Sequence, residues 1–383
     1  MTEHVYFMAL GGAQEIGASC YYLRLGQHNI ILDAGTGQKE GAVYRPDFYS
    51  LLTSPFLQSL NQIQQIYISH AHADHVGALP FLMHSAPHSD VYMTAPTAIL
   101  SEYQLYDRNR YLFSQKGEAQ RLLTQSLLER ITTVSFLHPF SFGSYQVDFY
   151  PAGHIPGAMM TLFTFGKRRI LYTGDISLEE TPLAQACLIP KDEIDTLILC
   201  GLHARHPHYQ RPAGMIEQKA QKVLDMVHRY HRSVLCQMSQ LSKGIEFIKL
   251  LNQYNHNHIP IYVDSGILQV AEKMERLGIP ILSGSGLVMG AQPPGTPHVF
   301  LTDRQIPELE GFYRQVRIDF TLHADYRDLS ELIRRINPRQ TVIVHCAPSD
   351  IPGLPTIEQE LMLDGDCRTQ FIFAESKEIY QLI

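Results

Sequence analysis

The stretch Ser69-His70-Ala71-His72-Ala73-Asp74-His75-Val76-Gly77 follows the apolar run Gln65-Ile66-Tyr67-Ile68 and carries four residues that can bind a metal ion. The apolar run predicts a strand, followed by a turn and by a helix that begins near Gly77. Alternate side chains of an extended segment share a face, so His70 and His72 can bind one ion. Asp74 and His75, where the chain turns, can reach a second ion. The spacing therefore indicates a two-metal site.

For any one of the 19 histidines, the simpler interpretation is a solvated loop residue or a hydrogen-bonded core residue. The cluster is different, because zinc prefers imidazole nitrogen and carboxylate oxygen as ligands. The motif His70-x-His72-x-Asp74-His75 resembles the metal-binding signature of the metallo-β-lactamase fold. That resemblance implies an α/β protein built as an αββα sandwich, with further ligands downstream.

Three more residues fit this resemblance. His154 lies in a turn that contains glycine and proline, and Asp175 lies just past an apolar strand. The resemblance implies that these two are the third and fourth ligand positions. A carboxylate can bridge two cations about 3.5 to 4 Å apart, so Asp175 is the predicted bridging ligand. Asp33 ends an earlier apolar strand; it is either an ordinary turn aspartate or, as the resemblance implies, a support beneath the metal site.

The segment from residue 214 to about residue 290 alternates helix and strand, with its last strand expected at Ile279–Leu282. This pattern predicts a second, partly parallel α/β layer structure. The segment resembles the β-CASP domain of nucleic-acid-processing hydrolases such as ribonuclease J and the endonuclease of mRNA 3′-end formation. The matching phrases are Arg232-Ser233-Val234-Leu235, Lys243-Gly244-Ile245-Glu246, Ile259-Pro260-Ile261-Tyr262-Val263-Asp264-Ser265 and Ser283-Gly284-Ser285-Gly286-Leu287-Val288.

The same resemblance extends to two later histidines, His323 as the motif B residue and His345 as the motif C residue. A histidine at motif C is similar to the RNA-processing members, whereas DNA-processing members tend to carry valine, so the resemblance implies RNA. The chain departs from the family at Cys200 and Gly201, where members carry the carboxylate that helps to orient the motif B histidine.

The resemblance also implies a ligand set and a mechanism. One ion is assigned to His70, His72 and His154, the other to Asp74, His75 and His345, and Asp175 is shared. Two divalent ions, zinc or manganese, lower the pKa of bound water towards about 7. His323 is predicted to protonate the leaving sugar oxygen as a general acid, and Asp33 and Asp175 complete the predicted catalytic set.

Four residues are predicted to contact substrate: Arg205, Lys243, Ser283 and Ser285. Arg205 lies in a loop dense in imidazole, guanidinium and an aromatic ring, a mixture that can contact phosphate and stack a base, or that forms a solvated polar loop. The other three belong to the phrases that resemble β-CASP proteins, and Lys243 stands where that family prefers arginine.

Length and composition suit a large soluble protein of several domains. The 383 residues are 45% hydrophobic and carry a net charge of −7, so an RNA substrate would have to be attracted by a local basic patch. Six scattered cysteines, the lack of a secretory signal and the lack of an apolar run of roughly 18 residues predict a cytoplasmic protein with no membrane contact. The predicted domains are a metallo-β-lactamase domain formed by residues 1–202 and 318–383 and a shortened β-CASP-like insert at residues 203–317.

Three functions remain open at this stage. The first is a two-metal ribonuclease that cuts single-stranded RNA internally or from an end. The second is a hydrolase of the same fold acting on a small phosphodiester or ester, which the acidic net charge and the altered motif A favour. The third is an RNA-binding protein that does not cleave. The sequence leaves both a monomer and a homo-oligomer open.

Overall fold

The computed structural model describes residues 4–108, 125–209, 214–238, 241–282, 288–289, 295–302, 311–318, 320–348, 356–363 and 367–383. The chain forms two compact units. Unit 1 contains Met1–Glu179, Gln185–Gln210 and His323–Ile383, and unit 2 contains Glu180–Ala184 and Arg211–Leu322.

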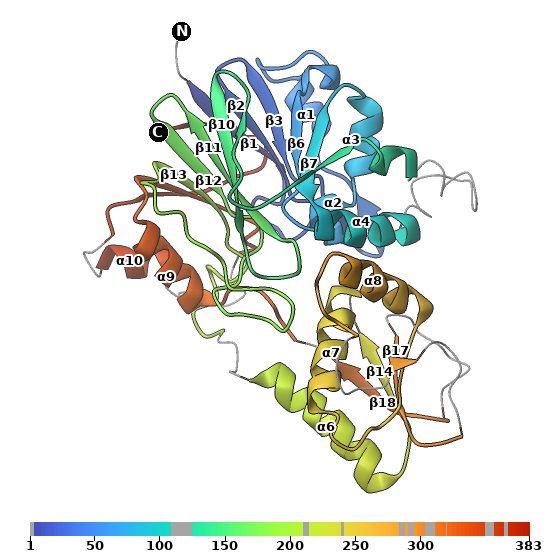
Figure 1. Ribbon diagram of the computed structural model, residues 1–383. Coiled ribbons are helices and arrows are strands. Elements are labelled where there is room, and N and C mark those ends of the chain that lie inside the picture. Colours follow the sequence, from blue (N-terminus) through green and yellow to red (C-terminus); the bar gives the residue numbers. More distant parts are fainter. Residues whose placement is uncertain are drawn as a thin grey trace. The chain divides into compact units, whose positions relative to one another are not determined.

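Unit 1 contains two sheets of seven strands each and a short hairpin (Figure 1). The first sheet has the order β21 (Ile379–Leu382), β1 (Val5–Gly11), β2 (Cys20–Leu25), β3 (His28–Leu32), β6 (Gln65–Tyr67), β7 (Asp90–Thr94) and β8 (Ile131–Val134). The second has the order β20 (Gln370–Phe373), β19 (Gln340–Val344), β13 (Thr196–Cys200), β12 (Arg168–Tyr172), β11 (Met159–Phe165), β10 (Tyr145–Pro151) and β9 (Phe140–Ser141). The hairpin pairs β4 (Gly37–Lys39) with β5 (Ala42–Tyr44).

Helices cover the outer sides of these sheets. The helices of unit 1 are α1 (Phe48–Leu52), the 3-10 helix η1 (Leu60–Gln62), α2 (Ala73–Val76), α3 (Leu79–Ser85), α4 (Ala95–Arg108), α9 (Tyr326–Ile336) and α10 (Ile357–Leu363). Figure 1 shows α1, α3 and α4 beside the first sheet and α9 and α10 beside the second. Within the described residues, every helix is too short or too polar to cross a membrane.

Side chains of β1 alternate between two hydrophobic cores. Phe7 and Ala9 join a cluster that also contains Phe149 and Phe163 from the second sheet, so this cluster fills the space between the sheets. Met8 lies on the opposite face and packs with residues of α1 and α3. A period of two with both faces apolar is what a sheet covered on both sides requires. The layers are therefore helix, sheet, sheet and helix, which confirms the predicted fold class.

The carboxyl ends of four strands carry the predicted site residues. Asp33 follows β3, the metal-binding stretch follows β6, Asp175 follows β12 and His345 follows β19. β3 and β6 run parallel, and so do β12, β13 and β19. The carboxyl ends of parallel strands lie at one edge of a sheet, which is where α/β proteins commonly place their ligands.

Unit 2 is a smaller α/β structure. Its five-stranded sheet has the order β16 (Val288–Met289), β15 (Ile261–Val263), β17 (Val299–Thr302), β14 (Val234–Met238) and β18 (Arg314–Ile318). All of its described strand pairs are parallel. The helices are α6 (Met215–Tyr230), α7 (Leu241–Tyr254) and α8 (Ser265–Arg276). The alternation of helix and strand agrees with the pattern expected from the sequence.

One local prediction is wrong. No strand forms at Ile279–Leu282, because the Glu275 carboxylate accepts hydrogen bonds from the backbone N–H groups of Ile281 and Leu282, at 3.1 and 2.7 Å. The helix expected over residues 118–131 lies partly outside the described residues. Residues 125–128 are helical, and Ile131 then begins β8 and pairs with Val91. The helix expected near Gly77 is α3, which begins at Leu79, and the short helix α2 (Ala73–Val76) precedes it.

Candidate metal centre

The metal-binding stretch changes from extended chain to helix within a few residues. His72 is extended and forms the N-cap of α2, so Asp74 and His75 lie on that short helix and not in a turn. The backbone N–H groups of His75 and Val76 donate to the carbonyl of His72, both at 2.9 Å. This change of direction separates the His70 and His72 side chains from those of Asp74 and His75, so that the two pairs face two neighbouring metal positions.

The first group of donors contains His70, His72, His154 and Asp175, all buried. His72 Nδ1 lies 3.1 Å from the Nε2 atoms of both His70 and His154. Asp175 Oδ2 lies 3.6 Å from His70 Nε2 and 3.9 Å from His154 Nε2. Four donor atoms from three separate chain segments therefore surround one small volume.

The second group contains Asp74, His75 and His345. His345 Nε2 lies 3.9 Å from Asp74 Oδ2. The other oxygen of Asp175, Oδ1, lies 3.5 Å from His75 Nε2. Asp175 thus presents one oxygen to each group, and the structure brings together all seven residues that the sequence assigned to metal binding.

The donors fit a divalent metal ion. Four ligands at 2.0–2.1 Å from a tetrahedral ion lie about 3.3 Å apart, close to the observed separations. Asp175 Oδ2 is buried without a hydrogen-bond partner among the described residues, as expected of an atom that awaits a cation. Burial, together with the neighbouring imidazoles, holds the pKa of His70 well below its usual value, so its ring is neutral and can ligate. The site is therefore suited to divalent metals.

Asp33 is completely buried beneath this centre and accepts hydrogen bonds on both oxygens. The backbone N–H of Ser69 donates to Oδ1 at 2.6 Å, and the Ser69 hydroxyl donates to Oδ2 at 2.7 Å. His75 Nδ1 and the Tyr172 hydroxyl also donate to Oδ2, at 2.6 and 2.5 Å. Because Nδ1 donates to Asp33, Nε2, which faces Asp175, is the nitrogen left to ligate. Asp33 thus orients a predicted ligand.

Asp33 and Asp175 also control the charge of His75. Burial alone would lower the pKa of this imidazole, but the two carboxylates outweigh it and raise the pKa to about 10. Burial raises the pKa of Asp175 itself, although His75 and His345 oppose that effect. A bound cation would displace the proton from Nε2 of His75.

Three residues of the site were not predicted from the sequence: Ser19, Ser69 and Tyr172. The Ser19 hydroxyl lies 2.8 Å from His345 Nδ1 and 3.5 Å from His75 Nε2, so it positions the second group. Ser69 is next to His70, and Tyr172 ends the strand before Asp175, so adjacency to a motif was the available signal for both. Ser19 offered only its place in a glycine-containing loop.

Three residues of the centre have a strained backbone. Asp33, His154 and His345 have φ values of 59°, 60° and 52°, in the left-handed region that disfavours residues with a Cβ. Gly35 is required for steric reasons, because a Cβ there would lie 1.7 Å from the carbonyl oxygen of Asp74. The Gly35 backbone can therefore pack directly against the metal-binding stretch.

His323 lies at the edge of the first group. Its Nδ1 is 3.3 Å from Asp175 Oδ2, and its ring centroid is 4.4 Å from that of His154. The side chain is 24% exposed, more than the ligands beside it. Burial and the imidazoles of His154 and His72 lower the pKa of His323 well below its usual value. An accessible neutral imidazole next to the Asp175 carboxylate can meet a substrate.

Cys200 stands where the resemblance implied a motif A carboxylate. Its thiol is buried, and its sulfur lies 3.7 Å from the Tyr172 hydroxyl that donates to Asp33. Burial raises the pKa of this thiol well above its usual value, so it stays neutral. Cys200 therefore supplies no carboxylate to His323, which contacts the carboxylate of Asp175.

Two of the four predicted substrate contacts are described. The Arg205 guanidinium lies 4.4 Å from the Phe373 ring centroid, and its Nη1 donates to Gln14 at 3.4 Å, so it is held within unit 1. Lys243 Nζ lies 5.6 Å from the Phe320 ring centroid in unit 2. Ser283 and Ser285 lie outside the described residues.

Comparison with known families identifies the fold. A family model described as the metallo-beta-lactamase superfamily matches residues 14–214, more than half of the chain. The chain belongs to the metallo-beta-lactamase superfamily. In this superfamily member, residues 314–352 also match a model described as the Zn-dependent metallo-hydrolase RNA specificity domain. The predicted family is confirmed.

Relatives with names agree with this assignment. Endoribonuclease ysh1 of Emericella nidulans is 30% identical over 278 residues, which is 68% of this chain and 30% of that protein. Endoribonuclease ysh1 of Schizosaccharomyces pombe is 28% identical over 70% of this chain and 35% of that protein. Probable RNase MJ4 of Methanocaldococcus jannaschii is 27% identical over 69% of this chain and 60% of that protein. This superfamily member thus spans about a third of the length of the fungal relatives.

A solved structure shares the fold across almost the whole chain. It is a protein of unknown function from Enterococcus faecalis V583, with a TM-score of 0.66 and 15% identity. The match covers 99% of this chain and 100% of that one. At 15% identity, this similarity shows a shared fold and nothing about function.

Proposed function

We propose that this superfamily member is a metal-dependent hydrolase that cleaves phosphodiester bonds in single-stranded RNA. The observation that carries the proposal is the convergence of seven donor side chains in two groups joined by the two oxygens of Asp175. The names of the relatives and the match to an RNA specificity domain support RNA as the substrate. In this proposal unit 1 is the metallo-β-lactamase domain and unit 2 is its β-CASP-like insert.

Two zinc ions are the proposed cofactors, with manganese as the alternative. His70, His72 and His154 would hold one ion, Asp74, His75 and His345 the other, and Asp175 both. Imidazole and carboxylate ligands without a thiolate suit either metal. When bound, two such cations neutralise charge on a phosphodiester and make hydroxide available near neutral pH.

The residues around the metal ligands would position the groups and move a proton. Asp33 keeps His75 in the tautomer that leaves Nε2 free to ligate. His323 would donate a proton to the leaving sugar oxygen. Its pKa is low in the free site, but the negative charge of a bound phosphodiester raises the pKa of a nearby imidazole. Substrate binding would therefore help to load the proton that the cleavage step consumes.

The test is a cleavage assay on matched 5′-phosphorylated single-stranded RNA and DNA, with protein loaded with zinc or with manganese. His345→Ala and Asp175→Ala should abolish turnover and reduce the metal content. His88→Ala is the matched control, because His88 is exposed after α3 and is not in either donor group. RNA-selective cleavage that is lost in the two site variants and kept in the control would support the proposal, and the product ladder would give the mode of attack.

Two other outcomes would replace the proposal. Cleavage of a small phosphodiester but not of RNA would indicate a small-molecule hydrolase, in line with Cys200 at the motif A position. Tight RNA binding without cleavage under either metal would indicate a binding protein. Full activity in both site variants would contradict the two-metal assignment.

A further inference from the structure

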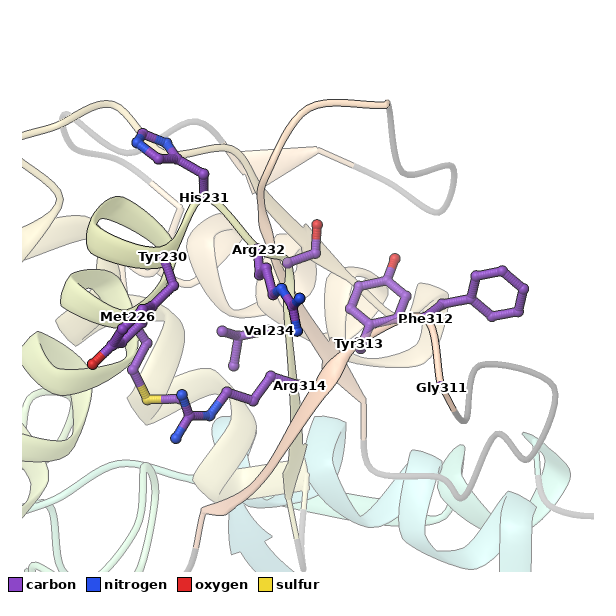
Figure 2. A pocket seen from close by; sticks show the side chains of 10 residues that line it. Met226, Tyr230, His231, Arg232, Val234, Gly311, Phe312, Tyr313 and Arg314 are labelled. Atoms are coloured by element: carbon purple, nitrogen blue, oxygen red, sulfur yellow. The ribbon is translucent and has the colours of Figure 1, made fainter.

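Two adjoining cavities lie on unit 2 between α6 and β18. Their volumes are about 920 Å³ and about 300 Å³, and both are lined by Met226 and Arg314. The rest of their lining comes from α6, from residues 231–234 and from residues 311–318. We refer to the two cavities and their lining as the α6–β18 surface, and Figure 2 shows the larger cavity. None of the metal-site residues belongs to it.

The α6–β18 surface is strongly basic. The basic side chains that line it are Lys219, Lys222, Arg232, Arg314 and Arg317, together with His231. Among the described lining residues of both cavities there is no aspartate or glutamate. The nearby Asp225 is outside the lining and lies 3.5 Å from Arg229. In a chain with a net charge of −7, such a cluster is a local positive field that favours a polyanion.

The helix contributes one continuous face to this surface. Lys219, Lys222, Met226 and Tyr230 follow one another at intervals of three or four residues, so they share a face of α6. Next to this face, α6 buries Ala220, Val223, Leu224, Met226 and Val227 in unit 2. Because burial fixes the helix on one side, the basic face is held towards the cavities.

Aromatic rings accompany the basic groups. Phe312 is 80% exposed and Tyr230 is 60% exposed, both large apolar surfaces that folding leaves in water. Figure 2 shows the Phe312 ring projecting beyond Tyr313 and Arg314. Tyr313 is held more firmly, because His298 Nε2 lies 2.7 Å from its hydroxyl. The Arg314 guanidinium lies 5.6 Å from the Tyr230 ring centroid.

We propose that the α6–β18 surface binds single-stranded RNA. Basic side chains next to exposed aromatic rings match what a single strand offers, since phosphates need cations and unpaired bases need flat rings on which to stack. A duplex hides its base faces and would use the basic groups alone. The choice of RNA over DNA rests on the proposed function, whereas the polyanion and the stacking rest on the surface itself.

The test is fluorescence anisotropy with a labelled single-stranded RNA and the full chain kept free of metal by chelator, so that binding is measured without cleavage. Phe312→Ala should weaken binding by roughly 5- to 150-fold, the range for loss of one stacked base, and leave the salt dependence unchanged. The double variant Arg314→Gln with Arg317→Gln should weaken binding and lower the slope of log affinity against log salt by about 1.4. Phe312 is exposed, so its loss should leave the fold intact.

The matched control is Arg229→Gln with Arg276→Gln, two exposed arginines of unit 2 that lie outside both cavities. Wild-type binding in this control and weak binding in both test variants would support the proposal. Equal binding in all variants would overturn it, and so would equal competition by duplex RNA or by polyglutamate. The two proposals can fail separately. A failed ribonuclease assay with intact RNA binding contradicts only the proposed function. Cleavage of a dinucleotide by metal-loaded Phe312→Ala would show that the metal centre still works when the α6–β18 surface is altered.

Discussion

Asp33→Asn is the substitution that tests most directly how the second donor group is organised. Three donors converge on Asp33 Oδ2, namely Ser69 Oγ, His75 Nδ1 and the Tyr172 hydroxyl. An asparagine that keeps its oxygen towards the Ser69 backbone N–H presents an NH₂ group to all three. The two hydroxyls can rotate and become acceptors, but His75 Nδ1 can accept only by giving up its proton. The proton then resides on Nε2, which can no longer ligate.

The expected loss follows from this change of tautomer. Removing the hydrogen-bond partner of a histidine ligand typically lowers metal affinity 10- to 100-fold, which is about 1.4 to 2.7 kcal/mol. Zinc affinity at pH 7 can be measured by competition with a chromogenic chelator, with circular dichroism to check the fold. Tyr172→Phe is the control, because it removes one donor and leaves the bond between Asp33 and His75 in place; its affinity should stay within about threefold of the wild type. Wild-type zinc affinity in Asp33→Asn would refute the reasoning.

Further predictions concern stability. Burial raises the pKa of Glu246, which accepts a 2.7 Å hydrogen bond from Thr181, from 4.5 to about 8. The unfolded chain loses this proton at a lower pH than the folded chain does. Glu246 therefore lowers the free energy of unfolding as pH rises from 4.5 to 8, by about 3 kcal/mol at pH 7. Calorimetry should show that Glu246→Gln raises the Tm more at pH 7.5 than at pH 5; an equal gain would argue against a buried protonated acid. Gly35→Ala should lower the free energy of unfolding by about 1 to 3 kcal/mol in urea titrations, because its Cβ would overlap Asp74. Gly295→Ala, where no described atom lies within 4 Å, should change that free energy by less than about 0.5 kcal/mol. Chelator should lower the Tm of zinc-loaded protein and added zinc should restore it, whereas an Asp175→Ala Tm that still responds to chelator would count against the shared ligand.

Local features were predictable because their causes are local. The spacing from His70 to His75 placed four donors within six residues, and a strand that gives way to a helix turns them to two sides whatever the rest of the chain does. The alternation of helix and strand patterns from residue 214 likewise indicated element type from adjacent residues. The prediction at Ile279–Leu282 was wrong because a side chain, Glu275, took the backbone donors that a strand would have used.

The tertiary structure decided which distant residues meet. Tyr172 donates to Asp33 across 139 positions, and Ser19 reaches His345 across 326, so nothing in their neighbouring residues could reveal either contact. The pairing of β21 with β1, and the lining of the same cavities by α6 and β18, depend in the same way on the order of strands in the completed sheets. The sequence by itself determined which chemical groups are present and how they repeat along the chain. Only folding decided their partners, because hydrogen bonds, charge and burial act through space while the sequence orders residues along a line.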